Sequence, residues 1–114
     1  MDDSILDSIK KILGMPPDYN AFDTDLIIHI NSVFGILTQL GVGPEGGFSI
    51  SDNTTTWQSY LGDSKDLEMV KSYTALKVRL VFDPPTVGAV MDAMKEQIRE
   101  FEWRLNVGME HRSS

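Results

Sequence analysis

Three features are missing from this sequence: cysteine, a long apolar run and a cluster of basic residues. Without cysteine the chain forms no disulfide and no zinc–thiolate site, so packing alone must stabilise the fold. No apolar stretch approaches the roughly 20 residues that span a bilayer, and the N-terminus is acidic where a signal peptide is basic. We therefore expect a cytosolic protein without a membrane segment.

The charge balance disfavours another class of function. The chain has 17 acidic and 10 basic residues, which gives a net charge of −7. Binding to nucleic-acid phosphates needs clustered lysine and arginine, and the densest basic run here is the pair Lys10 and Lys11. The negative charge also disfavours adhesion to an anionic membrane surface. We therefore expect neither a nucleic-acid-binding protein nor a membrane-bound one.

The 114 residues fit one domain, and apolar residues recur in them at helical spacing. The predicted helices are 3–13, 24–40, 54–61, 64–82 and 86–106. The second of these is apolar on several faces, so we expect it at the centre, with Asp23 as its N-cap. The pattern predicts an all-α fold, a compact bundle of about five helices. Residues 1–107 form the single helical domain in this interpretation, and residues 108–114 form a flexible C-terminal tail.

Residues 41–53, "GVGPEGGFSISDN", interrupt the helical pattern with four glycines and a proline. Phe48 and Ile50 alternate with Ser49 and Ser51, which is the spacing of a short strand. The segment is either a plain glycine-rich loop or a short β arm, and the residues leave both open. Loops of this length in compact domains are often functional.

A second interruption, "LVFDPPT" at residues 80–86, lies between the fourth and fifth predicted helices. Proline lacks the amide proton that continues a helix and disfavours the helical conformation of the residue before it. We expect the fourth helix to end near Phe82 and the fifth to fold back beside it. The motif is architectural, and we see no catalytic use for it.

No arrangement of residues predicts catalysis. His29 has Asp25 four residues before it, but no further ligand completes a metal site at a convincing spacing. The glycines of "GVGPEGG" match neither a phosphate-binding loop nor a dinucleotide fingerprint. We therefore expect no enzyme activity, no cofactor, and neither catalytic nor metal-binding residues.

Trp103 is the most informative single residue. The fifth predicted helix has an apolar seam, made of Val87, Met91, Met94, Ile98, Phe101 and Leu105. Trp103 lies roughly 200° from Phe101 around this helix, away from the seam and among charged side chains. A tryptophan on a charged face either anchors a partner or packs within its own chain, under an arginine stem or against another helix. The candidate partner-binding residues are Phe48, Ile50, Trp103, Arg104, Val107 and Met109.

Five segments together resemble a known family. They are "INSVFGILTQLGVGP", "FSISDNTTTW", "YLGD", "VRLVFDPP" and "EWRLNV", and the resemblance extends from about Ile5 to Val107. In this order they are similar to the small head–tail connector, or adaptor, proteins of tailed bacteriophages and of prophages of Gram-positive bacteria. None of these segments is a catalytic signature.

The resemblance implies a structural virion assembly protein that self-associates into a ring. The ring would dock on the portal protein of the DNA-filled capsid and present a surface to a tail-completion or tail-terminator protein. DNA would pass through its centre without specific binding. The resemblance places the protein in the host bacterial cytoplasm during assembly and then at the head–tail interface of the virion. It assigns portal contact to the C-terminal part, and hence to the end of the fifth helix.

Two other hypotheses remain at this point. One is a small helical protein-interaction or regulatory module encoded by a prophage, which would bind one protein instead of forming a ring. The other is a metal-dependent enzyme centred on His29. The first would use the same exposed helix faces as a connector, and the second requires ligands that the sequence does not supply at a recognisable spacing.

Overall fold

The computed structural model describes residues 4–16 and 18–113, and it describes side chains as far as Val107. It contains five α-helices: α1 (Ile5–Ile12), α2 (Asp23–Gln39), α3 (Trp57–Leu61), α4 (Leu67–Phe82) and α5 (Gly88–Ser113). No β-strand forms in the described ranges, where the only extended pairing is an isolated bridge between Ser4 and Thr56. The all-α prediction is confirmed, and residues 41–53 form a loop and no β arm.

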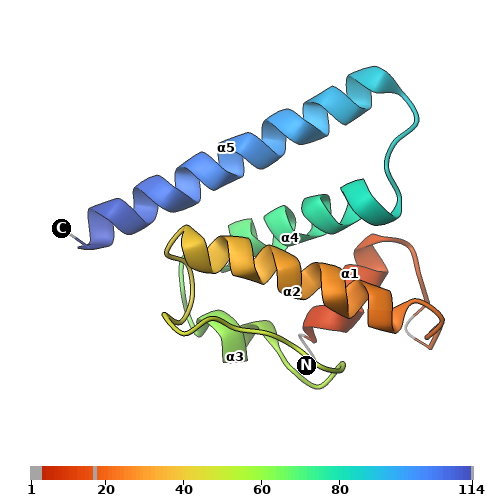
Figure 1. Cartoon of the computed structure of the whole chain (residues 1–114), viewed down its shortest axis with the longest axis horizontal. Coiled ribbons are helices and arrows are strands. Elements are labelled where there is room, and N and C mark those ends of the chain that lie inside the picture. The colour runs from red at the N-terminus through yellow and green to blue at the C-terminus, as the bar shows by residue number, and fades with distance from the viewer. Residues whose placement is uncertain (1–3, 17, 114) are drawn as a thin grey trace.

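The helices surround a central pair, α2 and α4, which pack against each other (Figure 1). Helix α1 contacts both members of this pair. The short helix α3 lies at one edge of the molecule, and α5 runs along the opposite edge, where it packs mainly on α4. This arrangement leaves one side of α5 without a neighbouring helix.

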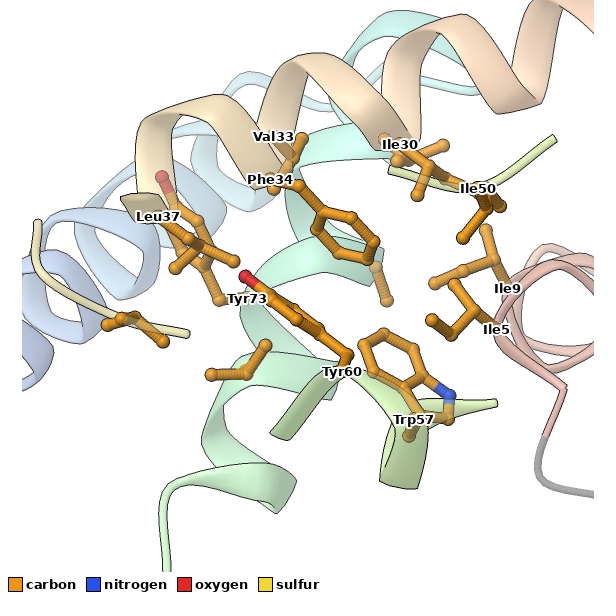
Figure 2. Close-up of a cluster of buried hydrophobic side chains, with 14 of the residues drawn as sticks. Ile5, Ile9, Ile30, Val33, Phe34, Leu37, Ile50, Trp57, Tyr60 and Tyr73 are labelled. Carbon is orange, nitrogen blue, oxygen red and sulfur yellow. The ribbon is translucent and has the colours of Figure 1, made fainter. Parts of the chain in front are cut away.

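Helix α2 supplies the centre of the core, as its apolar pattern predicts. Its buried residues are Leu26, Ile30, Val33, Phe34 and Leu37. Phe34 points into a cluster with Trp57 and Tyr60 of α3 (Figure 2), and the Phe34 and Tyr60 ring centroids are 4.4 Å apart. Such aromatic pairs add stabilisation beyond the area that they bury.

The start of α2 differs from the prediction. Phe22 occupies the N-cap position without a side-chain cap bond, and Asp23 is the first helical residue. The Asp23 carboxylate instead lies 2.9 Å from the ammonium group of Lys10, which is 1% exposed. A buried ammonium needs an opposite charge nearby, and this ion pair connects α1 to α2. The prediction that Asp23 is the N-cap is therefore wrong: Asp23 is the first residue of α2, and its carboxylate pairs with a lysine from another helix.

Hydrogen bonds fix α1 and α3 to each other at their N-terminal ends. The Ile5 amide donates to the Thr55 carbonyl at 3.0 Å, next to the isolated bridge. The Trp57 indole nitrogen donates to the Ser8 hydroxyl at 2.8 Å, so the buried tryptophan leaves no unpaired donor. These contacts close the core on the side opposite α5.

Helix α4 ends at Phe82, as the two prolines predict, but α5 begins at Gly88 and not at 86. Residues 83–87 thus form a separate connector between the two helices. Helix α5 then continues to Ser113, beyond the predicted end at 106. No proline follows that would stop it, and a single glycine in a helix costs only about 1 kcal/mol relative to alanine. The flexible tail at 108–114 and the domain boundary stay predictions.

Candidate functional site

One side of α5 faces solvent along the helix. We call it the outer face of α5 and define it by five exposed residues and the half-buried Val107; the exposed ones are Ala89, Ala93, Glu96, Glu100 and Trp103. The opposite side of the helix carries Met94, Ile98 and Leu105, which are buried against the bundle. The predicted seam of the helix therefore faces inward at these positions.

Trp103 dominates this surface. Its side chain is 66% exposed, the largest fraction among the exposed large apolar side chains. A shallow groove runs beside it along α5, lined by Ala93, Glu96, Gln97, Arg99, Glu100 and Trp103. An exposed tryptophan at the end of a groove has the character of residues that dominate binding energy at protein interfaces. Its exposure excludes the interpretation that Trp103 packs against another helix of the chain.

The charges beside Trp103 are paired within α5. Arg99 lies 2.9 Å from Glu96, and Arg104 lies 2.7 Å from Glu100. The hydrogen bond from Arg99, together with its positive charge, lowers the pKa of the Glu96 carboxyl below its usual value. These exposed pairs contribute little to stability. They do balance the two glutamates of the outer face with the two arginines beside it, whereas the chain as a whole is acidic.

The structure brings together only some of the predicted partner-binding residues. Trp103 and Val107 share the outer face, and Arg104 borders it. The side chain of Met109 lies outside the described residues. Phe48 and Ile50 belong to a different region, the loop that covers α3.

Phe48 and Ile50 are used inside the subunit. The Phe48 ring stacks on Tyr60 with ring centroids 4.6 Å apart. Ile50 is buried in the core (Figure 2). The Asn31 side chain accepts a hydrogen bond from the Ile50 amide at 2.8 Å and donates one to the Ile50 carbonyl at 3.0 Å. Asn31 thus pairs with Ile50 as a neighbouring strand would. The alternation that left a short β arm open as one of two predictions belongs to a loop held against α2.

A second apolar surface was not predicted from the sequence. We call it the aromatic end and define it by Tyr19, Phe22, His29 and Phe82. The rings of Phe22 and Phe82 are 5.4 Å apart, and those of Tyr19 and Phe22 are 5.9 Å apart. Tyr19 and Phe22 are both more than 40% exposed, at 45% and 41%. The cluster joins residues distant in the chain, so no local pattern indicated it.

His29 packs edge-on against Phe82 with ring centroids 6.0 Å apart. Among the side chains that the structure describes, in residues 4–16 and 18–107, no three from histidine, cysteine, aspartate or glutamate gather closely enough to hold a metal ion. The hypothesis of a metal-dependent enzyme centred on His29 therefore has no support in the described geometry. His29 serves here as part of an aromatic contact between α2 and the end of α4.

Across the described part of the chain, no helix is long and apolar enough to cross a membrane. Two separate surfaces are described on this helical body: the outer face of α5, with the exposed Trp103, and the aromatic end. Further apolar side chains are exposed as well, among them Ile28, Val81 and Val87. These features define a class: a small all-α protein whose surface suits contact with other proteins.

Comparison with protein families identifies the chain more closely. The family model described as "Phage connector protein" matches residues 5–112, nearly the whole chain. The protein therefore belongs to the phage connector family, whose members are structural components of the virion. No curated protein and no solved structure shows significant similarity to it.

Proposed function

We propose that the protein is a ring-forming head–tail connector, or adaptor, that docks on the portal and joins the DNA-filled capsid to the tail. The observation that carries this proposal is the family match over residues 5–112. The fold is compatible with it, because a connector subunit needs a rigid body and exposed surfaces for several neighbours. The outer face of α5 and the aromatic end are two such surfaces.

In this proposal the C-terminal half of α5 contacts the portal. Trp103 is the exposed anchor, with Arg104 and Val107 beside it. Interfaces commonly depend on a few aromatic or arginine anchors surrounded by contacts of small energy. Met109 lies further along the same helix and extends the proposed contact. Ile50 offers little surface to a partner, since it is buried in the isolated subunit.

The remaining partners follow from the position of a connector between head and tail. The ring consists of copies of this chain, and a tail-completion or tail-terminator protein binds its free side. DNA passes through the ring, and the net charge of −7 disfavours a lasting grip on the phosphates. The protein would act in the host bacterial cytoplasm during assembly and then remain at the head–tail interface.

The proposal is tested by mixing the purified protein with its portal and examining the mixture by electron microscopy. We expect extra ring-shaped density on one face of the portal. If portals stay undecorated over a wide range of protein concentrations, the connector proposal fails. A stable one-to-one complex with a host protein in native mass spectrometry would instead support an interaction module encoded by a prophage.

A variant identifies the docking surface. Because Trp103 is exposed, Trp103→Ala should leave the monomer folded, with a free energy of unfolding within about 0.5 kcal/mol of the wild type. Portal decoration should nevertheless weaken by at least about tenfold. Lys95→Ala is the matched control, because Lys95 is exposed on α5 but lies off the outer face. A stability loss of several kcal/mol would show that Trp103 acts inside the subunit.

A further inference from the structure

The outer face of α5 carries small residues at one end and large ones at the other. Ala89 and Ala93 are exposed near the start of the helix, and Trp103 and Val107 follow near the end of the described side chains. The six residues lie along one side of the helix, at alternating spacings of four and three, so the whole face could contact a second helix. Ala93 and Trp103 line the same groove, about 15 Å apart along the helix axis.

An antiparallel pairing of two α5 helices matches these sizes. If two copies of the chain are related by a two-fold axis at the level of Ile98, Trp103 of one copy faces Ala93 of the other. By the same symmetry Val107 faces Ala89. A parallel pairing would place Trp103 against Trp103 and Ala93 against Ala93, which crowds one end and leaves a void at the other. The size pattern therefore favours the antiparallel arrangement.

The centre of such a pairing is charged but balanced. Glu96 of one copy faces Glu100 of the other, which brings four carboxylates together at the axis. Each carboxylate already has an arginine on its own helix, Arg99 for Glu96 and Arg104 for Glu100. Four guanidinium groups thus accompany the four carboxylates. A polar centre in a helix seam lowers stability while it fixes register and orientation.

We propose that the free protein forms a two-fold antiparallel dimer through the outer face of α5, with Trp103 of each copy seated over Ala93 of the other. A single helix pair is at or below the small end of specific interfaces, roughly 1,200 Å² in total, so the dimer is weak and concentration-dependent. The role of the dimer rests on the proposed function, because the dimer covers the surface that we assign to portal contact. Dimerisation and portal docking therefore exclude each other, and the dimer holds subunits unassembled until a portal is present.

The test is a reciprocal exchange of the two residues, read by sedimentation equilibrium. The variants are Trp103→Ala, Ala93→Trp and the double variant that carries both changes, with Lys95→Ala as the control. Both positions are exposed, so each variant should keep the helical circular dichroism of the wild type. We expect each single change to weaken dimerisation by at least about tenfold. The double variant, which again sets tryptophan against alanine, should dimerise within a few-fold of the wild type.

Three outcomes would overturn the dimer. The first is a wild type that remains monomeric at about 1 mM, where even a marginal interface is half occupied. The second is a double variant that dimerises as weakly as the single variants. The exchange restores dimerisation only if positions 93 and 103 of the two copies face each other. The third is assembly into rings instead of dimers in the absence of portal. These results are independent of portal decoration: a wild type that dimerises but never decorates portals refutes the connector role alone.

Discussion

Asn31 is the residue on which the conformation of the loop at 41–53 depends most directly. Its side-chain amide makes two hydrogen bonds with the backbone of Ile50, at 2.8 and 3.0 Å, and Ile50 is buried. Replacing Asn31 with alanine removes both bonds and leaves the Ile50 amide and carbonyl without these partners. Two bonds at about 1 kcal/mol each, plus the cost of unpaired backbone groups, give an expected loss of about 2–3 kcal/mol in the free energy of unfolding.

The loss is measured by urea denaturation followed by circular dichroism. For a domain of this size it corresponds to a melting temperature lower by roughly 8–12 °C. Ser32→Ala is the matched control: Ser32 is the next residue on α2, and its exposed hydroxyl donates a hydrogen bond to the Ile28 carbonyl of its own helix. We expect that variant to stay within about 0.5 kcal/mol of the wild type.

Hydrogen exchange at the Ile50 amide gives an independent measure. In the wild type this amide should be protected, and in Asn31→Ala it should exchange markedly faster, because its acceptor is gone. The role assigned to Asn31 is wrong if the free energy of unfolding of Asn31→Ala lies within about 0.5 kcal/mol of the wild type. It is also wrong if the Ile50 amide keeps its protection from exchange in this variant.

Three further changes test other parts of the fold. Gly43→Ala should destabilise by about 2–4 kcal/mol, because φ is +84° there and a Cβ would lie 2.6 Å from the Tyr60 ring; an unchanged melting temperature in calorimetry would contradict this. Tyr73→Phe removes the 2.7 Å hydrogen bond to Glu102 that joins α4 to α5, so it should lower the free energy of unfolding, measured in urea, by about 1–2 kcal/mol. An unchanged free energy of unfolding would show that this bond does not stabilise the fold. Pro84→Ala should cost less than about 1 kcal/mol and leave the circular dichroism helical, whereas complete unfolding would show that the connector at 83–87 has a larger role.

The sequence predicts the helices well because their apolar spacing is a local property. Leu26, Ile30 and Leu37 are buried as their spacing requires. The ends of the helices depend on contacts that spacing does not record. Asp23 looked like a cap from its position, but the ammonium of Lys10, which comes from another helix, attracts its carboxylate. A sequence pattern contains no information about such a pairing.

The same distinction explains which partner-binding residues could be predicted. Helix geometry places Trp103 away from the inward side of α5, but the sequence left open whether another helix covers it; its exposure is visible only in the structure. Phe48 and Ile50 lie in a loop, where alternation cannot show which side faces the core. The aromatic end joins Phe22 to Phe82 across 60 residues of sequence and becomes visible only in three dimensions.

One of the two tryptophans is buried and the other is exposed, so their intrinsic fluorescence can report on the surface of α5. Trp57 is fully buried with its indole nitrogen bonded to Ser8, whereas Trp103 faces water. Their fluorescence should separate accordingly: iodide should quench the red-shifted emission of Trp103 while that of Trp57 stays shielded. Binding of a protein over the outer face of α5 would then shift the emission of Trp103 to shorter wavelength and reduce its quenching by iodide. No dye or tag is needed for this measurement.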